Sequence, residues 1–101
     1  MDNPSDQARF DELIHAPLRL RICASLAPVQ WADFSLLKQN LGVADSVLSK
    51  HIKQLADAEY VRVERFAKRG HSHLRVSLTE AGRTAYVGHV AALREITAGE
   101  G

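Results

Sequence analysis

The sequence has few cysteines, few aromatic residues and no long apolar run. Its 101 residues include one cysteine, Cys23, which excludes a disulfide framework within the chain and favours a reducing compartment. The apolar runs are too short to span a membrane, and the acidic N-terminal stretch MDNPSDQARFDE is unlike a secretory signal. These features predict a cytoplasmic protein without membrane association. The length suits one domain with one core.

The charge is small overall but unevenly distributed. The net charge is +1, yet residues 46–75 carry seven Lys and Arg against three Asp and Glu, a net charge of +4. The flanking parts, residues 1–45 and 76–101, are net negative. A basic middle third indicates a binding surface for a polyanion such as nucleic acid. A solvated surface of mixed charge explains the same composition equally well.

A helix-turn-helix is predicted over residues 34–58. Asp33 is placed to cap a short helix that stops at Gly42, and Asp45 to cap a longer helix that runs to about Ala58. A short helix, a glycine-containing turn and a longer helix in close order are typical of this motif.

The segments around this motif predict helices and a hairpin. Residues 61–78 alternate in polarity on both sides of a basic, glycine-containing tip, which indicates a β-hairpin, or wing. Thr79 is expected to cap a last helix over 79–98. The upstream elements are a helix over 6–15 capped by Ser5, a helix over about 17–27, and a short extended segment at 29–31.

The complete pattern resembles the winged helix-turn-helix transcriptional regulators of bacteria and archaea, most closely short single-domain relatives of the MarR and ArsR regulators. Three stretches carry the resemblance: IHAPLRLRI (14–22), DFSLLKQNLGVADSVLSKHIKQLADAEYVRVER (33–65) and VSLTEAGRTAY (76–86). LSKHIKQLADAEYV and SLTEAG are the most specific pieces. The resemblance implies one α+β domain, mostly α, over 1–101, with terminal dimerisation helices at 6–15 and 79–98. Glu59 departs from the pattern, since these proteins commonly carry glycine there.

Candidate DNA contacts lie on the second helix of the motif and on the wing. At 100° per residue, Leu48, Ile52 and Leu55 form an apolar stripe, and small hydroxyls and lysines face the other way. Such side chains contact base edges and phosphates, and arginine suits the minor groove. The alternative is a solvated charged surface. The candidates are Ser46, Val47, Ser49, Lys50 and Lys53 on the helix, and Arg65, Lys68, Arg69, His71 and Arg75 on the wing.

The terminal helices are expected to form a two-fold homodimer that binds a palindromic operator, because one small domain covers only a few base pairs. The candidate interface residues are apolar at helical spacing: Phe10, Leu13, Ile14, Tyr86, Val90, Leu93 and Ile96. If a small-molecule effector exists, its pocket is expected at Trp31, Tyr86 and His89.

No cofactor, metal or catalytic site is predicted. His71 and His73 share one side of a strand but lack further ligands at suitable spacing, and no nucleophile–base arrangement is present. The leading hypothesis is a sequence-specific regulator of double-stranded DNA, a homodimeric repressor that an effector releases if one exists. The alternatives are a winged helix protein-interaction adaptor and a metal- or redox-responsive regulator.

Overall fold

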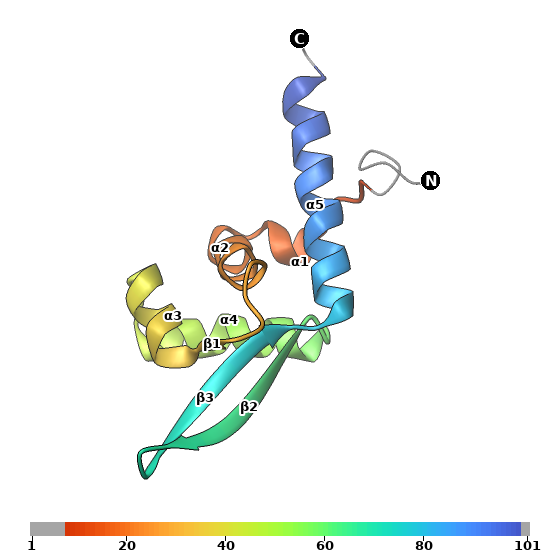
Figure 1. Ribbon diagram of the computed structural model, residues 1–101. Coiled ribbons are helices and arrows are strands. Elements are labelled where there is room, and N and C mark those ends of the chain that lie inside the picture. The colour runs from red at the N-terminus through yellow and green to blue at the C-terminus, as the bar shows by residue number, and fades with distance from the viewer. Residues whose placement is uncertain (1–7, 100–101) are drawn as a thin grey trace.

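The computed structural model describes residues 8–99, which form helices around one small antiparallel sheet (Figure 1). The strand order is β1-β3-β2. In chain order the elements are α1 (Glu12–His15), α2 (Pro17–Leu26), β1 (Ala32–Asp33), α3 (Phe34–Leu41), α4 (Asp45–Asp57), β2 (Val61–Lys68), β3 (His71–Leu78) and α5 (Glu80–Ala98). The predicted α+β winged helix-turn-helix fold is confirmed.

The core lies where α2, α3 and α4 pack against one another and against the base of the hairpin. The expected apolar stripe of α4 is its buried face, with Leu48 and Leu55 fully buried and Ile52 nearly so. The same cluster contains Ile14, Ile22, Cys23, Leu26, Leu37, Leu41, Val61 and Val76. Burial of these side chains fixes which face of α4 points outward.

The caps predicted at Asp33, Gly42 and Thr79 are confirmed, and the cap predicted at Asp45 is wrong. Asp33 accepts a hydrogen bond from the Ser35 N–H at 2.8 Å, and Gly42 ends α3 in the left-handed region at φ 68°. Thr79 Oγ1 accepts from the Gly82 N–H at 2.9 Å and begins α5. Asp45 is not a cap: Ala44 occupies that position, and the Asp45 carboxylate pairs with Lys38 Nζ at 2.8 Å.

The first helix is much shorter than predicted. Residues 8–11 are not helical, and α1 begins only after Asp11, whose carboxylate accepts from the Ile14 N–H at 2.9 Å. The second oxygen of Asp11 accepts from the Tyr60 hydroxyl at 2.6 Å, a contact across 49 residues that holds the chain extended before the helix. The expected Ser5 cap and residues 6–7 lie outside the described residues.

The short strand also lies later than expected. Val29–Trp31 follow a turn in which the Val29 N–H donates to Leu26 O at 3.2 Å, and pairing begins at Ala32, opposite Val76. The predicted wing is confirmed: β2 and β3 pair in continuous antiparallel register and are joined by Arg69 and Gly70. Both residues have positive φ, 53° and 78°, as in a type I′ turn.

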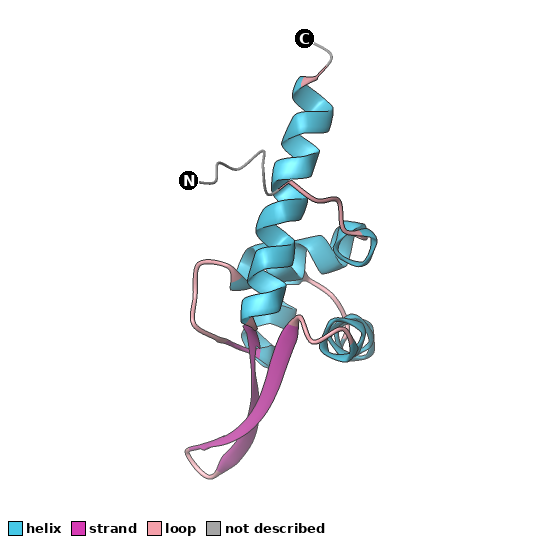
Figure 2. Cartoon of the chain, turned by 90° about the vertical axis from the view of Figure 1, so that its right-hand side faces the viewer, coloured by secondary structure: helices cyan, strands magenta, loops and turns pink. Residues whose placement is uncertain are grey.

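The hairpin and α5 leave the body of the domain in opposite directions. Figure 1 shows β2 and β3 reaching down and away from α4, while most of α5 rises on the other side, and Figure 2 shows the same separation. The fold therefore places the candidate DNA contacts at one end of the molecule and the candidate dimer contacts of α5 toward the other.

Candidate nucleic-acid interface

The outward face of α4 carries the helix residues predicted to contact DNA. Ser46, Val47, Ser49, Lys50 and Lys53 are all exposed. Val47 is notable because 41% of this apolar residue is exposed in the first turn of the helix. Lys53 Nζ lies 3.1 Å from the Asp57 carboxylate, but both side chains are open to solvent, so this pair is easily broken and leaves the ammonium available to another anion.

A hydrogen-bond network that the sequence did not predict holds α4 against α2. Arg19 Nη1 lies 3.0 Å from His51 Nδ1 and 2.7 Å from Gln54 Oε1, and its Nε donates to Leu13 O at 2.6 Å. Burial, followed by the nearby Arg19 charge, lowers the pKa of His51, which favours a neutral ring that accepts from the guanidinium. Nothing local in the sequence marks Arg19, because its partners lie 32 and 35 residues away.

The wing presents a second group of cations. Lys68, Arg69 and His71 are exposed at the tip, where the two-residue turn places them on adjoining strand ends. Arg65 is exposed and donates to Ser72 Oγ across the hairpin at 2.9 Å. The type I′ turn keeps the tip narrow, a shape suited to reaching a groove or the phosphate backbone beside the site of α4.

Arg75 differs from the other candidates because its guanidinium is engaged within the protein. Its Cζ atom lies 5.2 Å from the ring centroids of both Trp31 and Phe66, and its Nε lies 3.6 Å from Glu64 Oε1. The two rings meet edge to face at 5.6 Å. Arg75 thus supports the base of the wing by cation–π contacts, and its contact with DNA stays a prediction.

The candidate dimer residues fall into two groups. Ile14 is fully buried in the core of its own domain, so its side chain offers no surface to a second copy, and this part of the prediction is wrong. Phe10 and Ile96 are exposed, by 38% and 59%, as is Val87, which the sequence analysis did not single out. The remaining candidates are half-buried: Leu13, Tyr86, Val90 and Leu93.

The residues expected to line an effector pocket do not come together. Trp31 borders a pocket of about 400 Å³ between α3 and the wing, beside Leu36 and Phe66. His89 is fully buried in α5, against Phe10 and His15. Tyr86 packs against the core. The three residues therefore do not form one site. The burial of His89 was not predicted, because helix periodicity gives no information on which face of α5 the N-terminal segment covers.

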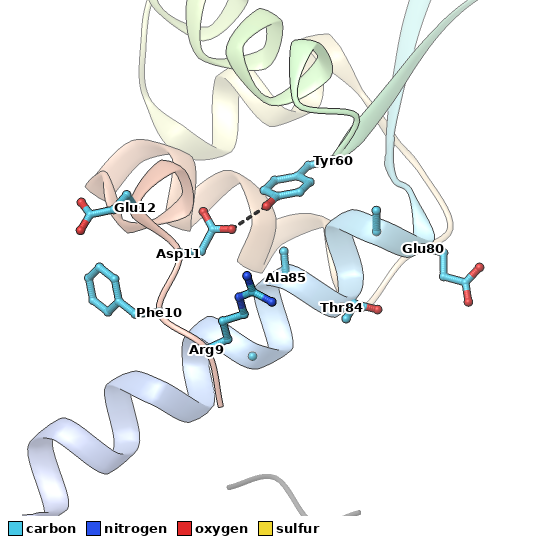
Figure 3. Close-up of a pocket in the computed structure, with 10 residues that line it drawn as sticks. Arg9, Phe10, Asp11, Glu12, Tyr60, Glu80, Thr84 and Ala85 are labelled. Carbon is cyan, nitrogen blue, oxygen red and sulfur yellow. Dashed lines mark hydrogen bonds between the residues drawn. The ribbon is translucent and has the colours of Figure 1, made fainter. Parts of the chain in front are cut away.

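A larger pocket lies between that N-terminal segment and α5. It has a volume of about 860 Å³, and its lining includes Arg9, Asp11, Tyr60 and Thr84 (Figure 3). Within residues 8–99 no group of three or more His, Cys, Asp or Glu side chains is placed to hold a metal ion. None of the helices in this part of the chain is long and apolar enough to cross a membrane.

Comparison with known proteins identifies the class to which this domain belongs. The family model of the winged helix DNA-binding domain matches residues 18–97, and the chain is a member of that family. This match spans the helix-turn-helix, the wing and most of α5.

Two individual proteins are similar over most of their length. An uncharacterised protein of Methanocaldococcus jannaschii is 24% identical over 79 residues, which are 78% of this chain and 86% of that protein. A structure described as a transcriptional regulator homologue of Pyrococcus horikoshii OT3 superimposes with a TM-score of 0.84 at 22% identity, covering 89% of each chain. The structural likeness supports the fold.

Proposed function

We propose that this protein is a transcriptional regulator that binds a specific site on double-stranded DNA through α4 and the wing. The observation that carries the proposal is the common placement of the exposed cations: Lys50 and Lys53 on the outward face of α4, and Lys68 and Arg69 on the tip of the wing. A helix of this kind fits the major groove, and its first turn, with Ser46 and Val47, is the part that meets base edges.

We further propose that the regulator acts as a homodimer on a palindromic operator. Support comes from α5, which extends well beyond the rest of the domain (Figure 2) and, near its end, exposes Ile96 on the same side as the half-buried Leu93. Large apolar side chains on the projecting part of a helix favour association with a second helix. A two-fold dimer would present two copies of α4 to two half-sites.

The proposal includes repression in the cytoplasm, with release by a small molecule, on the resemblance to winged helix regulators. The pocket of about 860 Å³ beside Tyr60 is the space suited to an effector, since it lies between the N-terminal segment and α5. A ligand there would contact two elements that the dimer is expected to use.

The test is binding to duplexes selected from a random pool, followed by fluorescence anisotropy over a salt series. The logarithm of affinity should fall linearly with the logarithm of salt concentration, with a slope of about −0.9 per phosphate neutralised. A double variant, Lys50→Gln with Arg69→Gln, should lose at least about tenfold in affinity. The slope of its salt dependence should be less steep by the amount expected for about two phosphate contacts.

The matched control is Arg21→Gln, Arg94→Gln, which removes the same charge from exposed positions on α2 and α5. Its affinity should stay within about twofold of the unchanged protein if the charges act locally rather than through the net charge. Equal losses in the two variants, or no enrichment of any sequence during selection, would contradict a specific interface on α4 and the wing.

A further inference from the structure

His89 is a fully buried imidazole with hydrogen-bonding partners on both ring nitrogens. Its Nδ1 accepts from the backbone N–H of Asp11 at 3.0 Å, and its Nε2 lies 3.3 Å from Nδ1 of His15. Phe10 covers the pair, with its ring centroid 4.7 Å from the centroid of each imidazole. The segment before α1 is therefore attached to α5 through two histidines and one phenylalanine.

These contacts determine where the protons lie. A backbone N–H can only donate, so Nδ1 of His89 carries no proton, and the neutral ring must carry its proton on Nε2. The Nε2–H group of His89 donates to Nδ1 of His15, which therefore carries no proton. The chain of donors runs in one direction, from Asp11 through His89 to His15.

One added proton breaks this chain wherever it binds. A proton on Nδ1 of His15 faces the Nε2–H of His89, and a proton on Nδ1 of His89 faces the N–H of Asp11. A tautomeric shift of His89 merely moves the conflict from the first contact to the second. In every protonated arrangement two donors oppose each other at one of the two positions.

The charges around the pair act in both directions. Burial, and then the neighbouring His15, lowers the pKa of His89, while Asp11 and Glu12 act to raise it. The Asp11 carboxylate is also bonded to Tyr60, whose pKa this bond raises, so that hydroxyl stays a donor. From α2, burial raises the pKa of the Cys23 thiol to about 11, which keeps it uncharged.

We propose that His15 and His89 form a proton-sensitive latch that holds Arg9, Phe10 and the backbone N–H of Asp11 on α5 at neutral pH and releases them in mild acid. The packing favours the neutral form of the His89 imidazole. The contribution of neutral His89 to the stability of the attached segment is complete above the pKa of an unfolded-chain histidine, about 6.5. It is lost as the pH falls below that value.

The release is confined to the segment before the Asp11 side chain, because the Asp11 carboxylate keeps its bonds to the Tyr60 hydroxyl and the Ile14 N–H. Ile14 is buried in the core and Leu13 O accepts from Arg19, and neither contact involves a histidine of the latch. Release would break the bond from the Arg9 N–H to Gly88 O and lift Phe10 from His89. The same residues border the pocket of about 860 Å³, so the latch controls access to it.

A consequence for regulation rests on the proposed function. Residues 9–12 and α5 both contribute to the proposed dimer surface, so mild acid would weaken dimerisation and, through it, binding to a palindromic site. The latch itself requires neither DNA nor a partner, and it is tested on the protein alone.

The experiment is a nuclear magnetic resonance titration of the full chain from pH 8 to pH 5, following the histidine side chains and the backbone amides. The amides of Arg9 to Glu12 and Gly88 should change together with the His89 ring, with a midpoint below pH 6.5, while those of α4 should follow the separate titration of its own His51. Amides of residues 9–12 that do not move during the His89 titration would overturn the latch.

Two variants separate the latch from general acid sensitivity. In His15→Asn the side-chain oxygen takes the place of Nδ1 as an acceptor but cannot be protonated in this range, so the repulsion that lowers the pKa of His89 is removed and the midpoint should move to higher pH. His71→Asn, at the exposed wing tip, should leave the midpoint unchanged. An unchanged midpoint in His15→Asn would also overturn the proposal, and DNA binding that is absent at every pH would overturn only the proposed function.

Discussion

Gly82 in α5 lies directly against the backbone of Tyr60, so closely that a Cβ atom at position 82 would stand 1.9 Å from the Tyr60 carbonyl oxygen. That oxygen accepts from the Thr79 N–H at 3.0 Å, and Thr79 Oγ1 donates to Glu59 O at 2.6 Å. The start of α5 is thereby fixed to the loop between α4 and β2. This close approach is the physical reason for glycine in the SLTEAG stretch.

Gly82→Ala should destabilise the domain by about 3 kcal/mol, because a rigid backbone group stands where the methyl would go. Urea unfolding followed by circular dichroism measures the change. Thr84→Ala, exposed on the same helix, is the control and should change the free energy of unfolding by less than about 0.5 kcal/mol. Equal stability of Gly82→Ala and the unchanged protein would mean that α5 does not sit this close to Tyr60.

Glu59→Gly should stabilise the domain. Glu59 has φ 65°, a left-handed conformation that costs a residue with a side chain about 1–2 kcal/mol. Glycine removes that cost but adds about 0.4–1 kcal/mol of unfolded-chain entropy, so the net gain should be about 0.5–1 kcal/mol. Glu59→Ala loses the same carboxylate without relieving φ and should show no gain in the same unfolding measurement. A gain of equal size in both variants would assign the effect to the charge instead.

Val47 is expected to pack on a thymine methyl group in the preferred DNA site. An exposed isopropyl group in the first turn of α4 has no polar partner to offer, and the thymine methyl is the apolar group in the major groove. Replacing the relevant thymine by uracil should weaken binding by about fourfold, the value of one buried methyl. Val47→Ala should bind the two duplexes equally. If the change from thymine to uracil lowers the affinity of Val47→Ala as much as that of the unchanged protein, the contact with the methyl group belongs to another residue.

Ile96→Asp should convert the proposed dimer into a monomer, because it places a charge in the exposed apolar surface near the end of α5. Sedimentation velocity over a range of concentrations measures the mass. Thr97→Asp adds the same charge one position further along, on a polar residue, and should leave the dimer intact. A monomer mass for the unchanged protein at every concentration would contradict the dimer itself.

The local features of the fold were predictable because their causes are local. Asp33 and Thr79 cap helices through bonds to residues two and three positions away, and Gly42 adopts a conformation that glycine favours. The stripe of Leu48, Ile52 and Leu55 follows from helical periodicity alone. The same reasoning selected the exposed candidates of α4 and the wing tip, whose contacts with DNA stay predictions.

The errors at the first helix and at His89 share one cause, which is contact between residues distant in the sequence. The helix expected over 6–15 begins only after Asp11, whose carboxylate is bonded to Tyr60. His89 was placed in an effector pocket but is buried beside His15, 74 residues away in the chain.

The amino-acid sequence by itself determined the order of helices and strands, the caps at Asp33, Gly42 and Thr79, and the polar face of α4, since propensity and periodicity act over a few residues. Only the tertiary structure decided which cations remain free, which apolar residues remain exposed, and which histidines lie together. Those outcomes depend on how α5 and the N-terminal segment pack across the core, and packing between distant segments leaves no periodic trace in the sequence.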